Sequence, residues 1–423
     1  MVCDYSVTPN WDKMRQMPEK IHKIDGSTLK VGFLYNHEVP HQVAHTAPIL
    51  REMLIRHPDV DVTVLTSTSE QKEIVMSGLG RELTAQAQFI DLKTEKSDSG
   101  ILRVANAIAP ARRVSVLQEN LDILAAFDVF VVPESTSLML KTQFGLNHLK
   151  FILTHHGAGD RAVTEKVSIR DFDFVLVPGE KLEKRHKEHG LIRDGDYAVA
   201  GYPKFDFVRQ EGTPDLFEND NPVVLYNPHF DPHLSSWYTM GEGVLDAFAA
   251  NPDLNLIFAP HIMIFQRKLH TSVEHKRIRR RKPFPKRFLE LPNIHVDLGS
   301  SRSVDMSYTR AADIYLGDVS SQLYEFLHER RPTIFLNSHD ADWAGNPLYL
   351  NWTTGPVLDN VDELIPAVRN ASDTHRDYLP AQNIAFEDTF ELGEGKSSVR
   401  AADAVAAWLR REALTEPELL AAQ

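Results

Sequence analysis

The sequence has 423 residues, 42% hydrophobic and 25% charged, which is ordinary for a globular protein of two or three domains. The net charge of −13 argues against a nucleic-acid partner, and the single cysteine, Cys3, excludes an intramolecular disulfide. No apolar run approaches the roughly 18 residues that span a bilayer, and the first 27 residues lack a signal peptide's apolar core. We expect a cytoplasmic protein that at most rests on the inner face of the cell membrane.

Short apolar runs alternate with helical patterns along the first half of the chain. The predicted strands are residues 29–35, 59–66, 89–92, 128–132, 151–154, 173–177 and 197–200, and the predicted helices are 42–56, 69–79, 115–126 and 180–189. This alternation predicts parallel β-α-β units. The polar, acidic segment 209–221 then interrupts the pattern and predicts a linker.

A second alternating series follows the linker. Its predicted strands are 222–226, 254–259, 293–296, 313–316 and 333–336, and its predicted helices are 234–250, 304–311, 321–330 and, near the end, 401–412. The layout predicts the GT-B architecture, an α/β fold of two Rossmann-like doubly wound domains that face a central cleft. The expected units are an N-terminal extension (1–27), a first domain (28–208), the linker (209–221), a second domain (222–395) and a C-terminal helix (396–423).

Polar residues follow several predicted strands directly, namely His156, His261, Asp318, Ser320 and Ser321. The carboxyl ends of parallel strands share one edge of a sheet, so these side chains are expected to converge in the cleft. Histidine can accept a proton at neutral pH, and the free amides at a helix start bind anions. Each residue also has a purely structural interpretation, as a helix cap or a loop residue.

No metal or cofactor is expected. The first strand is not followed by Gly-x-Gly-x-x-Gly, and no Walker-type loop is present, which argues against NAD and ATP sites. Zinc could use nitrogens from several histidines, but no pair has the His-x-x-x-His spacing of a helical site: His155, His156, His229, His233 and His261.

Five motifs in chain order resemble the CDP-glycerol glycerophosphotransferase family, which includes the teichoic-acid polymerases and primases. They are His156-Gly157, Gly201-Tyr202-Pro203-Lys204-Phe205-Asp206, Tyr226-Asn227-Pro228, Pro260-His261 and Asp318-Val319-Ser320-Ser321. The resemblance implies transfer of glycerol phosphate from CDP-glycerol to an acceptor hydroxyl of a lipid-linked or polymeric envelope component.

The resemblance also implies roles for individual residues. It makes His156 the base and puts His261, Ser320 and Ser321 on the donor pyrophosphate. The other residues that it places in the donor site are Asp318, Gly157, Tyr226, Pro228 and Glu325.

The chain departs from the family pattern near the expected polyol end of the donor. Ala158 replaces the usual Thr, His229-Phe230-Asp231 replaces a segment with Thr and Trp, and Glu325 replaces Asp. The donor could therefore be another CDP-alditol or a nucleotide sugar. Two alternatives remain open, a GT-B glycosyltransferase and a non-catalytic nucleotide-sensing protein.

Residues 267–287 form a basic stretch with ten Lys and Arg residues and one acid, Glu274, and apolar residues interleave with them. We expect this stretch, and Arg279, Arg280 and Arg281 in particular, to dock on anionic lipid or an anionic acceptor polymer beside the cleft. The structural alternative is a solvated basic helix and loop.

Overall fold

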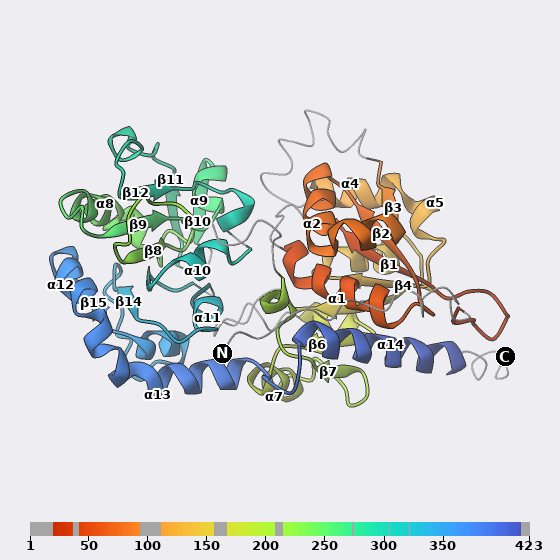
Figure 1. Cartoon of the computed structure of the whole chain (residues 1–423). Helices are drawn as coiled ribbons and strands as arrows, with labels where there is room; N and C mark the ends of the chain where they lie inside the picture. Colours follow the sequence, from red (N-terminus) through yellow and green to blue (C-terminus); the bar gives the residue numbers. More distant parts are fainter. Residues whose placement is uncertain are drawn as a thin grey trace.

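A computed structural model describes residues 20–36, 42–93, 111–155, 167–207, 215–272, 275–303, 305–320 and 322–415. These residues form two parallel β-sheets, one in each half of the molecule (Figure 1). Two long helices, α13 (Ala371–Thr389) and α14 (Ser397–Thr415), run along one side from the second half to the first.

The first sheet has seven strands in the order β3-β2-β1-β4-β5-β6-β7, and every pair is parallel. Each strand matches a predicted one to within two residues. The strands are β1 (Lys30–Tyr35), β2 (Asp61–Thr66), β3 (Gln88–Asp91), β4 (Val129–Val132), β5 (Lys150–Thr154), β6 (Phe174–Val177) and β7 (Tyr197–Val199).

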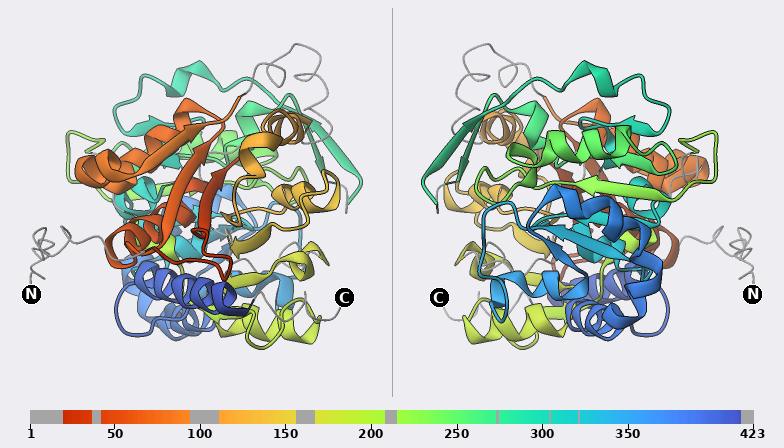
Figure 2. Two further views of the ribbon diagram at one scale, coloured as in Figure 1. Left: turned by 90° about the vertical axis from the view of Figure 1, so that its right-hand side faces the viewer. Right: turned by 90° about the vertical axis from the view of Figure 1, so that its left-hand side faces the viewer.

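Helices cover both faces of this sheet, because successive strand side chains point to opposite faces. Phe33 packs in one core with α1 (Val43–Arg56), α2 (Ser69–Gln86) and α14, whereas Leu34 packs in the other core with α4 (Ala111–Glu119) and α5 (Leu121–Leu124). Two further helices are α6 (Met139–Thr142) and α7 (Glu180–Glu188). Seen end-on, α14 lies beneath the red and orange strands (Figure 2).

The second sheet has six parallel strands in the order β12-β9-β8-β13-β14-β15. They are β8 (Val223–Asn227), β9 (Asn255–Phe258), β12 (Ile294–Val296), β13 (Ile314–Gly317), β14 (Thr333–Leu336) and β15 (Val357–Leu358). Its helices are α8 (Gly241–Ala249), α9 (Met263–Gln266), α10 (Ser307–Ala311), α11 (Gln322–Phe326), α12 (Leu364–Arg369) and α13.

The structure corrects the sequence prediction in several places. The basic stretch contains an antiparallel hairpin, β10 (Leu269–Ser272) and β11 (Arg277–Arg280), and not a helix. Helix α11 is only five residues long, shorter than predicted. Helix α8 begins at Gly241 and not at residue 234 as predicted. Strand β15 and helices α6, α9, α12 and α13 were not predicted at all.

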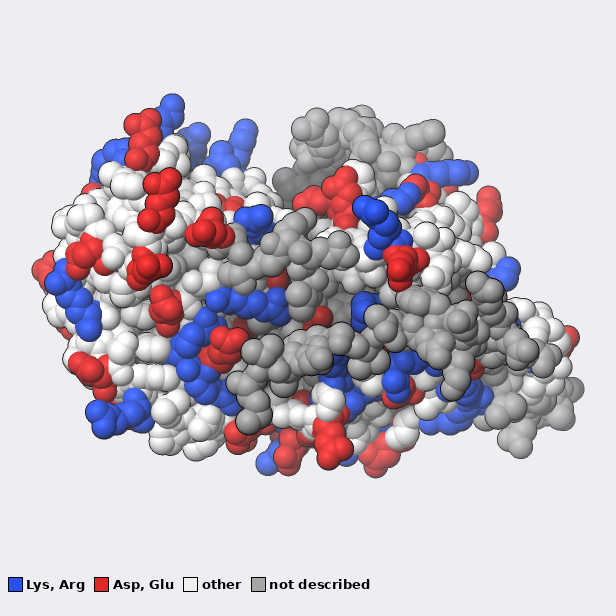
Figure 3. All heavy atoms as spheres, viewed as in Figure 1, with Lys and Arg blue, Asp and Glu red and all other residues white. Residues whose placement is uncertain are grey.

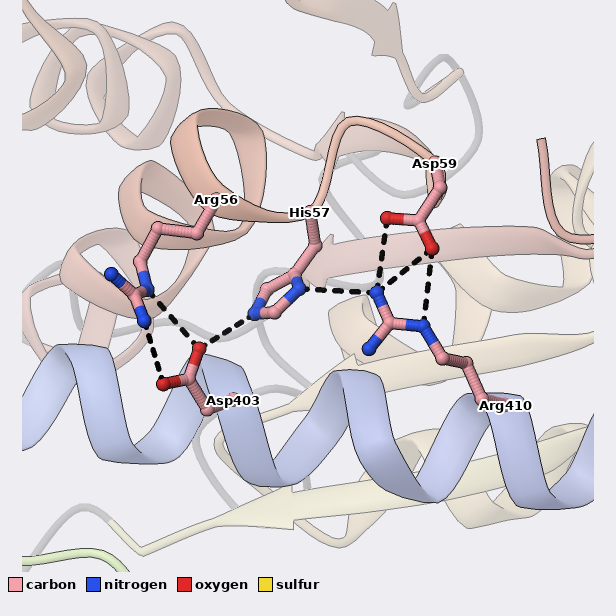
Figure 4. A network of polar contacts seen from close by, with 5 residues as sticks. All are labelled: Arg56, His57, Asp59, Asp403 and Arg410. Atoms are coloured by element: carbon pink, nitrogen blue, oxygen red, sulfur yellow. Dashed lines mark hydrogen bonds and ion pairs between the residues drawn. The ribbon is translucent and has the colours of Figure 1, made fainter. Parts of the chain in front are cut away.

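Helix α14 returns to the first half and is fastened there by an ionic network (Figure 4). Arg410 donates to Asp59 (2.8 Å) and to Nδ1 of His57 (3.2 Å), and Asp403 accepts from Nε2 of His57 and from Arg56, both at 2.8 Å. Burial would raise the pKa of Asp403, but these two hydrogen bonds hold it below its ordinary value. The network precedes β2, at the opposite edge of the sheet from the carboxyl ends, so we regard it as structural.

Candidate active site

The strand order of the second sheet reverses between β8 and β13, because β9 and β12 lie beyond β8 whereas β14 and β15 lie beyond β13. In open parallel sheets, ligands bind outside the carboxyl ends of the strands at such a reversal. Parallel pairing sets Asn227, the last residue of β8, beside Gly317, the last residue of β13. The segments that follow these two strands therefore meet, and they carry several of the predicted donor-site residues.

Asp318 follows β13 directly and is 1% exposed. Its carboxylate accepts hydrogen bonds from the backbone amides of His229 (2.9 Å), Ser236 (2.8 Å) and Val319 (2.8 Å), and from the Ser236 hydroxyl (2.9 Å). Burial raises the pKa of Asp318 to about 6, although these hydrogen bonds favour the ionised form. The side chain thus holds the segment after β8 against the end of β13.

Ser320 and Asn227 join three strand ends. The Ser320 hydroxyl donates to Oδ1 of Asn227 (3.0 Å) and accepts the backbone N–H of Gln322 (3.3 Å), the first residue of α11. This contact matches the structural alternative for Ser320, and its donor contact remains a prediction. Asn227 in turn donates through Nδ2 to the carbonyl oxygen of Ala259, which follows β9 (2.7 Å). Side-chain hydrogen bonds of Ser320 and Asn227 therefore connect the ends of β8, β9 and β13.

His261 lies beyond the end of β9, and its backbone amide donates to the carbonyl oxygen of Pro228 (3.0 Å). Its Nδ1 accepts the backbone N–H of Met263 (3.3 Å). Burial, with a smaller effect from the charge of Arg267, lowers the pKa of His261 to about 4. The ring is therefore neutral at pH 7 and carries its proton on Nε2, so Nε2 is a hydrogen-bond donor and the ring is not a cation.

Tyr226 and Pro228 support this edge from within the domain. The Tyr226 side chain is fully buried against Phe258, and its hydroxyl donates to Oγ of Ser236 (2.9 Å), the group that itself donates to Asp318. Pro228 is buried and supplies the carbonyl oxygen that receives the His261 amide. Their predicted contacts with a donor remain predictions.

Glu325 links the two halves of the chain. Its Oε1 accepts hydrogen bonds from Nζ of Lys204 (2.6 Å) and from the Tyr202 hydroxyl (3.2 Å), and Lys204 is only 2% exposed. Lys204 and Tyr202 belong to the segment after β7, so two motifs that seemed separate in the sequence form one contact. Oε2 of Glu325 is buried and accepts no hydrogen bond from the described residues.

The first sheet reverses its strand order between β1 and β4, and a polar cluster lies at that edge as well. Asn36, after β1, and Glu134, after β4, are both buried, and Arg113 of α4 forms an ion pair with Glu134. Nε of Arg113 donates to the Asn36 carbonyl oxygen (3.1 Å), while Nδ2 of Asn36 donates to the Arg113 carbonyl oxygen (2.9 Å). Both sheets thus carry a polar group at the point where ligands are expected.

A sequence profile of the CDP-Glycerol:Poly(glycerophosphate) glycerophosphotransferase family matches residues 86–407. The chain belongs to this family.

Individual relatives are more distant. The teichoic acid glycerol-phosphate transferase of Staphylococcus aureus is 29% identical over 105 residues, a segment that spans 22% of this chain and 27% of that protein. Among solved structures, the wall teichoic acid polymerase TagF superposes with a TM-score of 0.59 at 13% identity, over 92% of this chain and 90% of the polymerase. UDP-GlcNAc 2-epimerase from Neisseria meningitidis superposes with a TM-score of 0.54 at 12% sequence identity, over 90% of this chain and 99% of the epimerase. These likenesses are of fold, and they confirm the GT-B prediction.

Three of the residues that the family resemblance singles out, His156, Gly157 and Ser321, lie outside the described residues. Of the basic residues expected to contact the acceptor or the membrane, Arg279 and Arg280 lie on β11 and Arg281 follows it. Nε2 of His270 in the hairpin contacts the carbonyl oxygen of Met263 (2.8 Å), so the hairpin is anchored two residues beyond His261.

The described part of the chain holds no group of three His, Cys, Asp or Glu side chains placed to bind a metal ion. None of the helices described there has the length and apolar character needed to cross a bilayer.

Sequence reasoning missed two positioning residues of this family member. Asn227 is the middle residue of the Tyr226-Asn227-Pro228 motif, and its place at the end of a strand could have identified it. Ser236 carried no local signal, because its partner Asp318 is 82 residues away in the chain.

Proposed function

We propose that this chain transfers glycerol phosphate, or a related alditol phosphate, from a CDP-linked donor to a hydroxyl of a cell-envelope polymer or lipid acceptor. Family membership supports the reaction class. The observation that carries the assignment of the site is the hydrogen-bonded junction of β8, β9 and β13. Asp318 holds the segment after β8, and Asn227 holds the segment after β9, which bears His261.

In this proposal the acceptor oxygen attacks the phosphorus that carries the glycerol, and the bond to the bridging oxygen of the pyrophosphate breaks. His156 takes the proton of the acceptor hydroxyl, and CMP leaves. The Nε2–H of His261 and the two serines that precede Gln322 in the sequence, Ser320 and Ser321, bind the pyrophosphate oxygens, where fixed donors stabilise developing charge. The second domain (222–395) holds the donor, and the first domain (28–208) holds the acceptor near Asn36 and Arg113.

The basic hairpin is the proposed contact with an anionic lipid surface or acceptor at the inner face of the membrane. Lys and Arg side chains gather along the upper edge of the second half, over β10 and β11 (Figure 3). Two aliphatic residues of the hairpin, Leu269 and Ile278, are 60% and 69% exposed.

Flotation with anionic vesicles tests the proposed contact between the basic hairpin and an anionic lipid surface. We expect the Arg279→Glu, Arg280→Glu, Arg281→Glu variant to stay unbound, and equal binding by this variant and the wild type would remove the idea.

The second candidate is a GT-B glycosyltransferase with a nucleotide-sugar donor. The departures at Ala158, His229 and Glu325 favour it, as does the fold shared with an epimerase solved with bound UDP-GlcNAc.

Release of CMP on mixing the protein with CDP-glycerol and an envelope-polymer acceptor separates the candidates, with UDP-sugars tested in parallel. We expect CMP from CDP-glycerol and no UDP from the sugars. The His156→Ala variant should bind CDP-glycerol yet release no CMP, while His148→Ala, an exposed histidine in the same half, should behave as wild type. Turnover by His156→Ala at the wild-type rate would reject the assigned base.

A further inference from the structure

The two faces of the basic hairpin differ in what they contact. Along β10 every second residue is buried, and His270 and Ser272 are each 2% exposed. Cross-strand partners in an antiparallel pair share a face, and Arg279 pairs with His270 while Arg277 pairs with Ser272. The inner face is therefore His270, Ser272, Arg277 and Arg279, and the outer face is Leu269, Thr271, Ile278 and Arg280.

The inner face carries two arginines whose charge the protein does not neutralise. Both Arg277 and Arg279 are exposed, and neither forms a hydrogen bond or an ion pair with a residue that the structure describes. Nδ1 of His270 and Oγ of Ser272 are buried on the same face, also without a hydrogen-bond partner in the described ranges. Uncompensated cations beside unsatisfied polar groups favour a polar, anionic ligand on this face.

The hairpin reaches across the edge of the second sheet that carries the candidate active site. At its root, Nε2 of His270 contacts the carbonyl oxygen of Met263, shortly after β9 (2.8 Å). At its tip, the ring of His275 lies 3.7 Å from the ring of His233, which follows β8, measured between centroids. The ring of His233 lies in turn 5.1 Å from that of His339, which follows β14. Because β8 and β13 lie between β9 and β14 in the sheet, the hairpin spans the reversal of strand order.

The two inner arginines act electrostatically on the segments that follow these strands. Burial, and then the charge of Asp231, raises the pKa of Tyr238, whereas the charge of Arg279 opposes the rise. Burial lowers the pKa of His339 to about 4, and among the neighbouring charges that of Arg277 adds to this effect. Together with the strand register, these effects place both guanidinium groups on the side of the hairpin that faces the strand ends.

We propose that the inner face of the hairpin binds the acceptor, and that Arg277 and Arg279 each contact a phosphate group of an anionic phosphodiester polymer. Residues two apart on a strand are separated by about 7 Å, so one extended chain with repeated phosphates can reach both guanidinium groups. Exposed arginines suit such a polyanion, because displaced counterions add to its affinity. A flat bilayer meets one face of a hairpin at a time, and the exposed Leu269 and Ile278 make the outer face the one suited to lipid. The identity of the polymer rests on the proposed function, in which the donor occupies the strand ends.

Two arginines on the same strand but on opposite faces provide a matched comparison. Arg279→Gln and Arg280→Gln remove the same charge, and the Arg277→Gln, Arg279→Gln double variant removes both inner charges. Each protein is titrated with fluorescently labelled, lipid-free poly(glycerol phosphate) over a range of salt concentrations, and a thermal melt confirms folding. We expect Arg279→Gln to bind the polymer roughly fivefold more weakly, the double variant at least about tenfold more weakly, and Arg280→Gln within about twofold of wild type. The slope of log affinity against log salt concentration should fall by about 0.7 for each inner arginine removed.

Flotation with anionic vesicles should show the reverse order, with Arg280→Gln binding roughly fivefold more weakly and both inner-face variants binding as wild type. Equal loss of polymer affinity in Arg279→Gln and Arg280→Gln, or no loss in the double variant, would overturn the assignment of the inner face. A double variant that keeps its polymer affinity but loses vesicle binding or affinity for CDP would instead place these arginines on lipid or on the donor, and would reject the inference.

The proposed function can fail separately from this inference. If the wild type releases no CMP from CDP-glycerol, the proposed reaction is wrong, but the polymer titration still decides the role of the inner face. If CMP is released and the inner-face variants bind the polymer as tightly as the wild type, only the present inference is rejected.

Discussion

The buried ion pair between Lys204 and Glu325 offers a test of how the two halves of the chain are joined. The two side chains are 2% and 6% exposed, and Nζ lies 2.6 Å from Oε1. Removing one partner leaves the other charge buried without its counter-charge, which costs stability, whereas removing both charges leaves no buried charge to compensate. The Tyr202 hydroxyl also donates to Oε1, so Glu325→Gln is chosen because its amide oxygen can still accept that bond.

We expect Lys204→Met to lower the free energy of unfolding by about 3–5 kcal/mol, because the Glu325 carboxylate then keeps only the Tyr202 hydroxyl as a partner. Glu325→Gln should cost a similar amount, since it leaves the Lys204 ammonium uncompensated. The double variant carries no buried charge and should lie within about 1–2 kcal/mol of wild type.

The free energies of unfolding of the wild type, the two single variants and the double variant are measured by guanidinium unfolding. They are compared only if far-ultraviolet circular dichroism and tryptophan fluorescence give coincident transitions. A double variant that loses the sum of the two single losses would refute the ion-pair argument. The double variant also tests the donor role predicted for Glu325, because we expect the double variant to be nearly as stable as the wild type. We expect its affinity for CDP-glycerol to stay within about threefold of wild type, and a tenfold loss would instead support donor contact by Glu325.

Three further predictions concern single groups. Because burial raises the pKa of Asp318 to about 6, the donor affinity measured by calorimetry should fall from pH 7 to pH 5 as the carboxyl group gains a proton. The contribution of Asp318 to folding stability has the opposite pH dependence: it is complete below about pH 4 and is lost as the pH rises through 6. Gly201→Ala should lower the melting temperature by several degrees, because φ is 80° and a Cβ would lie 2.7 Å from the carbonyl oxygen of Glu391. Trp408→Ala should cost about 3–5 kcal/mol in urea unfolding, because the indole of α14 is 4% exposed and stacks on Phe174.

The strands were the most predictable part of the fold. A parallel strand covered by helices on both faces reads as a continuous apolar run, as in Asp128–Val132, and such runs located most strands closely. The hairpin of β10 and β11 was missed because its burial does not follow polarity. In β10 the buried residues are the polar His270 and Ser272 whereas Leu269 is exposed, and every residue of β11 is exposed. Helix α13 was missed because few of its residues are buried and Pro380 lies inside it.

That His261, Asp318 and Ser320 lie at one edge of the sheet was predictable, but the atomic contacts among the residues there were not. Polar residues after apolar runs identify one edge of a parallel sheet, which is how His261, Asp318 and Ser320 were found. Local sequence made Asp318 a helix cap, yet its carboxylate binds the amides of His229 and Ser236 across the sheet. That contact depends on the register that sets Asn227 beside Gly317, and a single sequence does not contain the register.

The same dependence on register explains why the sequence showed His229 only as a departure from the family pattern and as one of five histidines considered for zinc. Read along the chain, Pro228-His229 and Pro260-His261 are two unrelated dipeptides 32 positions apart. Only the pairing of β8 with β9 makes them neighbours. Only the hydrogen bonds from the Asp231 amide to Nδ1 of His229 and from the Met263 amide to Nδ1 of His261 show that they are the same turn used twice.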